Sequence, residues 1–327
     1  MGSSCSKNNN ATPTTDVVVT TNDTVATIYN DSNSCLLAVQ FDNEKAIRVL
    51  KYLSAKDEWT ICHEIPVKGL YRATIVKQYL LFHDWQNGVR VCCYDTTTRV
   101  IRTLKPLKED QPYWSCYCAT EFQECLYLIG ADTEDNRKVY VWDPESDVLT
   151  EAPKLNIGRT RTTALKHEGY LYVAGGMVTK DDMVSYNARD TNSVERFNPR
   201  RNCWERCSPL LQARCVAGMA SAGRFIYVVG GDCVSTPTNM VERYDTRINK
   251  WTQLIAMQVP KVFPATIYFN NRLTVCGNSS NDEDCALVEE FDETTNKWIR
   301  KNKMPIEGPF SYVVAKPEWV NQLEALN

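Results

Sequence analysis

The sequence predicts an all-β protein assembled from six similar units. Three observations predict it: an eleven-residue phrase that occurs twice, an anchor residue that recurs at a nearly constant interval, and short apolar runs with the two-residue period of β-strands. Almost no segment shows the period of a helix. The 327 residues are therefore better described as one repetitive domain than as two unrelated ones.

The repeated phrase is VERFNPRRNCW, which ends at Trp204, and VERYDTRINKW, which ends at Trp251. In the second copy, Val241, Arg243 and Asp245 alternate with Glu242 and Tyr244, as in a strand with one face toward the core. Residues 245–249 then indicate a turn, because Asp and Asn side chains bond to nearby backbone and tolerate tight dihedral angles. Each phrase is therefore predicted to be a β-hairpin whose aromatic residues, Tyr244 and Trp251 in the second, face the core.

The anchor position recurs along most of the chain. Equivalent residues are separated by 42, 48, 55, 47 and 47 positions: Trp59, Ile101, Leu149, Trp204, Trp251 and Trp298. Two further short apolar runs precede each hairpin, and in two units the second run ends in a glycine pair, which suits crowded backbones or positive φ angles. Each unit is therefore predicted to contain four strands.

This order of strands resembles the kelch repeat, whose units are the blades of a β-propeller. The resemblance is strong over residues 154–304, where it is carried by Gly175-Gly176, Phe197, Trp204, Gly230-Gly231, Tyr244 and Trp251, and it rests on spacing alone over residues 24–153. It implies a six-bladed kelch-type β-propeller, with seven blades as the alternative, because a single blade cannot bury both of its faces.

The units set the predicted organisation of the chain. Residues 1–23 are expected to be a disordered tail, rich in Asn, Ser and Thr, and residues 318–327 a carboxyl-terminal tail. The predicted blades are 24–66, 67–107, 108–153, 154–209, 210–257 and 258–304, followed by a closing strand at 309–317. That strand is expected to pair with the first blade, but an apolar run at 25–30 would already give this blade four strands, so two ways of closing the ring stay open.

Net charge, apolar runs and cysteine placement limit the classes of partner and the cellular compartment that the sequence predicts. A net charge of −3 argues against a general nucleic-acid binder and against polybasic membrane binding, and no apolar run approaches the ~20 residues that span a bilayer. No secretory signal is apparent. Several of the fourteen cysteines lie in apolar strand runs, so they are expected to be reduced, buried thiols of a cytoplasmic protein: Cys35, Cys92, Cys118, Cys125 and Cys276.

The amino terminus carries a candidate lipidation signal. MGSSCS matches the myristoylation pattern, with Gly2 as the acceptor and Ser6 at the required position, and Cys5 is a candidate palmitoyl acceptor. Two acyl chains would anchor the protein stably, whereas one would not. The alternatives are a chance match and a cloning remnant of the Met-Gly-Ser-Ser type.

The sequence offers no catalytic set. His63, His83 and His167 fall at unlike places in different units, and no nucleophile elbow, phosphate loop or calcium loop is present. The kelch-like ring of galactose oxidase holds copper with residues for which this chain has no matching motif. We therefore expect no enzyme activity, no metal and no cofactor.

A basic rim is the candidate binding site. Counting back 16 residues from the first glycine position of four units gives Trp114, Arg159, Arg214 and Lys261, at the turn before the innermost strand. Aligning the second unit adds residues near 69, so the predicted partner-binding set is Lys68, Arg72, Trp114, Arg159, Arg161, Arg214 and Lys261. In kelch proteins this turn opens onto one face, which implies recognition of a protein or an acidic peptide. The alternatives are that the repeat places a basic residue there for solubility, or that these cations pair with carboxylates of neighbouring blades.

These expectations favour a non-enzymatic adaptor that binds a protein and is held at a membrane by its acylated amino terminus. Longer loops at 177–193 and 232–239 would add to its binding face. Two alternatives remain: the substrate receptor of a cullin-type ubiquitin ligase, for which only about 23 residues precede the first strand in place of a BTB and BACK region, and an actin-organising kelch protein.

Overall fold

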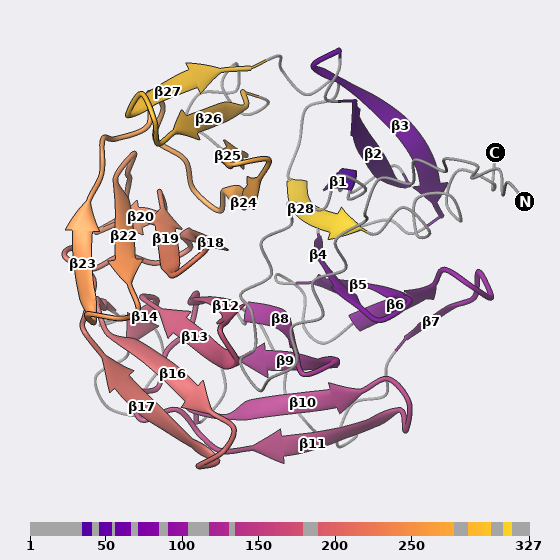
Figure 1. Ribbon diagram of the computed structural model, residues 1–327. Helices are drawn as coiled ribbons and strands as arrows, with labels where there is room; N and C mark the ends of the chain where they lie inside the picture. The colour runs from indigo at the N-terminus through magenta and orange to yellow at the C-terminus, as the bar shows by residue number, and fades with distance from the viewer. Residues whose placement is uncertain are drawn as a thin grey trace, which may run out of the picture.

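The computed structural model of the chain is a closed ring of six four-stranded antiparallel sheets (Figure 1). The structure describes residues 35–40, 46–53, 56–66, 71–84, 91–103, 118–130, 135–178, 189–277, 287–301 and 310–315. All regular secondary structure within these ranges is β-strand. No described segment is therefore a helix that could cross a membrane. The all-β prediction is confirmed.

Each sheet is one blade, and we number the blades from 1 to 6 along the chain. Blade 1 pairs β28 (Phe310–Ala315), β1 (Cys35–Gln40), β2 (Ile47–Leu53) and β3 (Glu58–Ile65). Blade 2 holds β4 (Tyr71–Val76), β5 (Tyr79–Asp84), β6 (Val91–Asp95) and β7 (Ile101–Thr103). Blade 3 holds β8 (Cys118–Phe122), β9 (Cys125–Ile129), β10 (Val139–Asp143) and β11 (Val148–Ala152).

The second half of the ring repeats this order. Blade 4 holds β12 (Thr163–His167), β13 (Tyr170–Ala174), β16 (Val194–Asn198) and β17 (Cys203–Cys207). Blade 5 holds β18 (Gly218–Ala222), β19 (Phe225–Val229), β22 (Val241–Asp245) and β23 (Lys250–Gln253). Blade 6 holds β24 (Ala265–Phe269), β25 (Arg272–Cys276), β26 (Glu289–Asp292) and β27 (Lys297–Arg300).

The ring closes through β28, the last strand of the chain. β28 pairs with β1 along its full length, from Cys35 opposite Ala315 to Gln40 opposite Phe310. As the inner strand of blade 1, it also contacts the inner strands β4 and β24 of the two neighbouring blades. The structure confirms six blades and the closing strand, whereas the competing run at 25–30 lies outside the described residues.

The hydrophobic core lies between blades rather than within them. Six separate clusters of buried side chains fill the six junctions, each drawn from two adjacent blades. The cluster between blades 4 and 5, for example, packs Tyr172 and Val194 against Val228, Tyr244 and Trp251. This arrangement explains why the anchors recur, since each unit must present one apolar face to the unit before it and another to the unit after it.

The outer hairpin of every blade turns through a residue in the left-handed region. These six residues have φ between 51° and 64°, and each lies two positions before its anchor: Asp57, Arg99, Asp147, Asn202, Asn249 and Asn296. Asn and Asp adopt this conformation more readily than other residues with side chains. Arg99 of blade 2 is therefore the strained member of the set.

Replacement of Arg99 by asparagine is expected to raise the free energy of unfolding by about 0.5–1 kcal/mol, because it relieves backbone strain at an exposed turn. Urea denaturation measures the change. The reciprocal variant Asn296→Arg, at the equivalent turn of blade 6, should lose a similar amount. A loss of stability in Arg99→Asn would mean that the arginine side chain matters more than its backbone angle.

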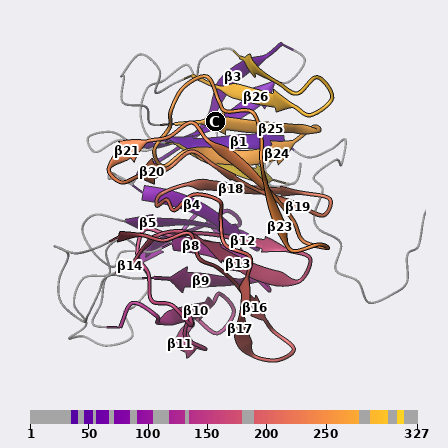
Figure 2. The same cartoon turned by 90° about the vertical axis from the view of Figure 1, so that its left-hand side faces the viewer.

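The two faces of the ring carry different connections. Linkers between blades and loops between second and third strands emerge on one face, which we call the loop face; the turns within the two hairpins of each blade emerge on the other, the hairpin face. Two small hairpins extend the loop face, β14 (Met177–Val178) with β15 (Arg189–Asp190) and β20 (Asp232–Cys233) with β21 (Thr236–Pro237). Figure 2 shows β14, β20 and β21 together at the left-hand side of the molecule.

Candidate functional site: the loop face of the propeller

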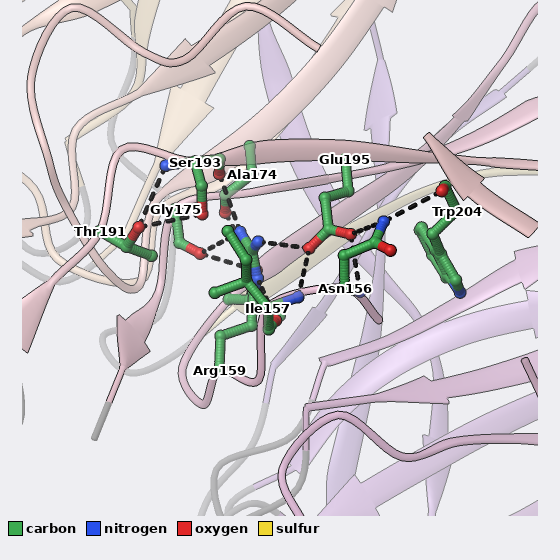
Figure 3. A network of polar contacts seen from close by, with 10 residues as sticks. Asn156, Ile157, Arg159, Ala174, Gly175, Thr191, Ser193, Glu195 and Trp204 are labelled. Carbon is green, nitrogen blue, oxygen red and sulfur yellow. Dashed lines mark hydrogen bonds and ion pairs between the residues drawn. The ribbon is translucent and has the colours of Figure 1, made fainter. Parts of the chain in front are cut away.

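The linker that leads into blade 4 buries an arginine beneath the loop face (Figure 3). Arg159 donates from Nη2 to Glu195 Oε1 of β16 over 2.7 Å. Its Nη1 donates to the carbonyl oxygens of Gly175 and Ser193, at 3.1 and 2.8 Å. The other carboxylate oxygen of Glu195 accepts hydrogen bonds from the backbone and side-chain nitrogens of Asn156. The network therefore fixes the linker to the second and third strands of its own blade.

Blade 5 repeats the network with different residues. Arg214 donates from Nη2 to Glu242 Oε1 of β22 over 2.5 Å and from Nη1 to the carbonyls of Gly230 and Met240. Glu242 also accepts the backbone N–H of Leu211 at 2.7 Å. Both arginines and both glutamates are fully buried. Burial lowers the pKa of each guanidinium from its ordinary value, while the paired carboxylate raises it in part.

Blade 6 has lysine at the same position, and its described contacts differ from those of the two arginines. Lys261 Nζ donates to the carbonyl of Leu287 at 3.1 Å. Glu289, the counterpart of Glu242, accepts the backbone N–H of Gln258, but its Oε2 is buried without a hydrogen bond from any described residue. Burial raises the pKa of Glu289, and Lys261 offsets that shift only in part. A compact ammonium does not offer the planar fork of donors that completes the other two networks.

These networks correct the prediction of an exposed basic rim. Arg159, Arg214 and Lys261 lie at equivalent places near the loop face, as the repeat indicated, but each is 0% exposed and cannot contact a partner in this structure. For the two arginines the ion-pair alternative is right about the pairing with carboxylates, but the carboxylates belong to the same blade and not to a neighbouring one.

Of the four other predicted partner-binding residues, one has a described side chain and three do not. Arg161 is exposed, so its role in partner binding stays a prediction. Lys68 and Trp114 lie outside the described residues, and only the backbone of Arg72 is described, in β4. Gly2 and Cys5 also lie outside them. The structure therefore leaves one exposed residue of the set on the described part of the loop face.

The glycine pair of blade 4 allows the next linker to pass close by. Gly175 has φ +61°, and a Cβ placed on it would lie 2.4 Å from the carbonyl oxygen of Arg214. The following residue, Gly176, donates its N–H to that same carbonyl at 2.9 Å. Only glycine satisfies both the dihedral angle and the contact. The glycine pair is thus a junction between blades, as its sequence context predicted.

The linker turns of blades 4, 5 and 6 are joined into a belt. Arg161, Val216 and Phe263 occupy equivalent positions, and all three have φ between 48° and 52°. Val216 donates its N–H to the carbonyl of Arg161 at 2.9 Å, and Phe263 donates to the carbonyl of Val216 at 3.0 Å. The loop face consequently rests on a rigid base across three blades.

Two hairpins project from this base and touch each other. The backbone N–H of Val234, at the tip of the β20–β21 hairpin, donates to Asp190 Oδ2 of β15 over 2.7 Å. Val234 is 81% exposed and has φ +51°, a conformation that a β-branched residue rarely adopts, and Ser235 follows at +60°. Nearby on the linker, Leu211 is 56% exposed. The loop face therefore presents apolar side chains to solvent on a strained but tethered tip.

The structure does not bring the described histidines together. His63 lies in blade 1 beside the hydroxyl of Tyr94, whereas His167 lies in blade 4, where burial lowers its pKa to about 4. Only the backbone of His83 is described, in β5. Within the described ranges, no group of three or more His, Cys, Asp or Glu residues could hold a metal ion. Six of the described cysteines are free thiols: Cys93, Cys125, Cys203, Cys207, Cys215 and Cys233.

A family model and a solved structure are similar to parts of this chain. Residues 158–211 and 213–258, which span blades 4 and 5, match the family model described as Kelch motif. A search of solved structures finds "Structure of YjhT", with a TM-score of 0.58 and 13% identity over 72% of this chain and 85% of that one. At that identity the likeness shows the fold alone.

Curated relatives carry the same repeat. Kelch repeat and BTB domain-containing protein 1 of cowpox virus is 22% identical over 123 residues, which cover 36% of this chain and 21% of the relative. Kelch domain-containing protein 7A of Mus musculus is 31% identical over 37% of this chain and 14% of its own length. Kelch-like protein 6 of Homo sapiens is 26% identical over 39% and 19%. The match thus spans about a fifth or less of these relatives. Together with the two motif matches, they show that blades 4 and 5 are similar to kelch repeats.

Proposed function

We propose that this chain is a non-enzymatic adaptor that binds a protein partner on its loop face. The observation that carries the proposal is the pair of touching hairpins, because Val234 is exposed, apolar and held in a strained conformation by Asp190. Strained, exposed residues on a rigid scaffold are common at recognition sites. The belt of linker turns supplies that scaffold.

The side chains of the loop face suggest the chemistry of the partner. Leu211 and Val234 offer apolar contact, while Arg161 and Arg189 are exposed cations on the neighbouring blade. A peptide segment that places a hydrophobic side chain beside carboxylates would fit both groups, since arginine binds carboxylates bidentately. The proposed partner is therefore a protein with an acidic, partly apolar segment, bound without chemical conversion.

Val234→Asn tests this proposal, because it separates binding from stability. Asparagine tolerates the left-handed conformation better than valine, so the variant should unfold at the same or a higher temperature while its capture of partners in a proximity-labelling experiment falls at least fivefold. The matched control is Val148→Asn, which removes a 48% exposed valine from the outer strand of blade 3. Equal capture by wild type and Val234→Asn would contradict the proposal.

Membrane tethering at the cytoplasmic face is a separate part of the proposal. It rests on the sequence at Gly2 and Cys5, because two acyl chains give stable attachment. Labelling with a clickable myristate should report incorporation in wild type and none in Gly2→Ala. Labelling that persists after the substitution would remove the tether while leaving partner binding on the loop face intact.

A second candidate function is substrate recognition for a cullin-type ubiquitin ligase. It is favoured by three poxvirus relatives whose name includes a BTB domain, although the match covers only 21% of each of them. Recovery of a cullin scaffold with this chain would support this function, and its absence would favour the adaptor. Actin organisation, the remaining alternative from the sequence, predicts co-sedimentation with filaments.

A further inference from the structure

The hairpin face is polarised in charge, as a comparison of the six equivalent outer turns shows. The turn of blade 4 reads NPRRN (198–202) and that of blade 5 reads DTRIN (245–249), whereas blade 3 has DPESD (143–147) and blade 6 has DETTN (292–296). The outer turns of blades 1 and 2 carry one cation each, Lys56 and Arg99, whereas those of blades 4 and 5 together carry three: Arg200, Arg201 and Arg247. The turns of blades 3 and 6 carry mainly acids.

Five cations of blades 4 and 5 form a cluster that we call the basic sector: Arg200, Arg201, Arg224, Arg247 and Lys250. All five are exposed, and the side chain of Arg201 reaches 74%. Glu205 pairs with Arg201 and Asp245 with Arg224, but both carboxylates are largely buried, at 21% and 13% exposed.

The remaining cations of the sector make no ion pair with any described residue. They are Arg200, Arg247 and Lys250. Two further acids lie close to the sector: Glu168, which is 39% exposed and accepts a hydrogen bond from Thr246, and Glu293, which is 33% exposed and pairs with Arg243. The sector is thus net positive where it meets solvent.

An exposed apolar residue stands within this sector. Ile248 is 65% exposed at the tip of the blade 5 turn, with Arg247 before it and Lys250 two positions after it. The tip is held firmly, because Asn249 binds Ser208 of the preceding linker through two hydrogen bonds, at 2.9 and 2.6 Å, and Thr246 bonds to the backbone carbonyl of Arg224. No large movement is needed to present the isoleucine.

The members of the sector share one side of the molecule. In Figure 2 the turns that join β16 to β17 and β18 to β19, and the start of β23, all lie toward the right, opposite the β14 and β20–β21 hairpins of the loop face. Blades 4 and 5 are adjacent in the ring, with their inner strands β12 and β18 in contact. The cations and Ile248 therefore lie on the same surface of the molecule.

We propose that the basic sector is a contact surface for an anionic membrane, with Ile248 entering the headgroup region. Each cation near an acidic leaflet strengthens binding roughly fivefold, and an apolar side chain among cations is typical of interfacial contact. The net charge of −3 does not oppose this, because electrostatic potentials decay within about 8 Å at physiological ionic strength, so local charge dominates.

This inference rests on the proposed membrane location, but not on acylation. A single acyl chain binds marginally, and a basic patch is one of the second signals that makes such attachment stable. Contact through the hairpin face would leave the loop face directed away from the membrane. The hairpin face would then contact lipid, and the loop face would bind the protein partner.

Vesicle co-sedimentation of the full chain carrying Gly2→Ala tests the basic sector without a myristoyl chain. At about 50 mM salt the protein should bind vesicles of phosphatidylcholine with one-third phosphatidylserine, and binding should be lost on pure phosphatidylcholine or at high salt. Lys250→Glu should lower the partition coefficient at least fivefold, and Ile248→Ser at least threefold.

Lys297→Glu is the matched control, since it makes the same change at the equivalent turn position of blade 6, and it should leave binding within twofold. An equal loss in Lys250→Glu and Lys297→Glu would overturn the proposal, because attraction would then not depend on the basic sector. So would binding of a polyanion such as RNA by the same residues without binding to acidic vesicles. Myristate labelling with no vesicle binding by the Gly2→Ala chain would retain the tether and reject this surface.

Discussion

Replacement of Arg214 by alanine should lower the free energy of unfolding by about 3–5 kcal/mol, because it leaves the buried carboxylate of Glu242 without its cation. The carbonyls of Gly230 and Met240 lose their donor at the same time. Urea denaturation followed by tryptophan fluorescence measures the loss. Arg159→Ala should behave alike through Glu195, since the two networks are copies of each other.

Two further variants show whether the charge or the packing is responsible. The double variant Arg214→Met with Glu242→Leu removes both charges and should recover most of the lost stability, because a buried ion pair replaced by apolar groups of similar size costs little. Arg206→Ala, an exposed arginine on β17, should change stability by less than about 0.5 kcal/mol. If Arg214→Ala weakened partner capture at unchanged stability, the buried network described above would be wrong and the exposed rim right.

Truncation of the chain after residue 308 should abolish cooperative unfolding. It removes β28, so β1 loses an antiparallel partner along its whole length, and β4 and β24 lose their neighbour in the inner ring. The apolar clusters that blade 1 shares with blades 2 and 6 then become open to water. In the intact ring β28 pairs with the inner edge of β1, whereas the truncated chain would leave that edge unpaired.

Truncation after residue 317 is the control, because it shortens the chain but keeps β28. This form should retain a single sharp unfolding transition by differential scanning calorimetry. Addition of the missing strand as a synthetic peptide to the shorter form should restore part of the transition. Sharp unfolding of the form that ends at 308 would show that five complete blades suffice.

The repeat predicted the architecture because one spacing carried several independent signals. The intervals between Trp59 and Trp298 reappear in the structure as the intervals between six left-handed turn residues, which no single residue type could have revealed. Asn at three of these positions and Asp at two indicated a turn by residue type. Blade 2 has Arg99 at the turn and Ile101 at the anchor position, so it was predicted by spacing and not by residue type. The tryptophans also contribute beyond packing: Trp204, Trp251 and Trp298 each donate from Nε1 to a carbonyl of the preceding linker.

The candidate site was less predictable, because the repeat spacing predicts which backbone positions are equivalent between blades. It does not predict the direction in which the side chains point. Arg159, Arg214 and Lys261 stand where the repeat placed them, but they turn inward. The missing signal was Glu242 in VERYD: it lies on the same side of its strand as Tyr244, so the alternation that buries the tyrosine also buries the glutamate. A buried carboxylate is stabilised by a paired cation, and the arginine at the equivalent linker position supplies it in blades 4 and 5.

The touching hairpins of the loop face and the basic sector of the hairpin face were beyond the sequence for a different reason. Val234 and Asp190 are brought together by blades 4 and 5 lying side by side, which depends on the closed ring. Likewise, the net charge of −3 gives no hint of where charges gather, because it sums over both faces and all six blades.

Closure by β28 has a consequence for biosynthesis. The first blade begins at Cys35 but receives its inner strand only when Phe310–Ala315 has been made, roughly 270 residues later. At 5–20 residues per second, a ribosome needs on the order of tens of seconds for that distance. During this interval the nascent chain exposes an unpaired edge of β1 that a chaperone can recognise, and the ring closes only after β28 has been made.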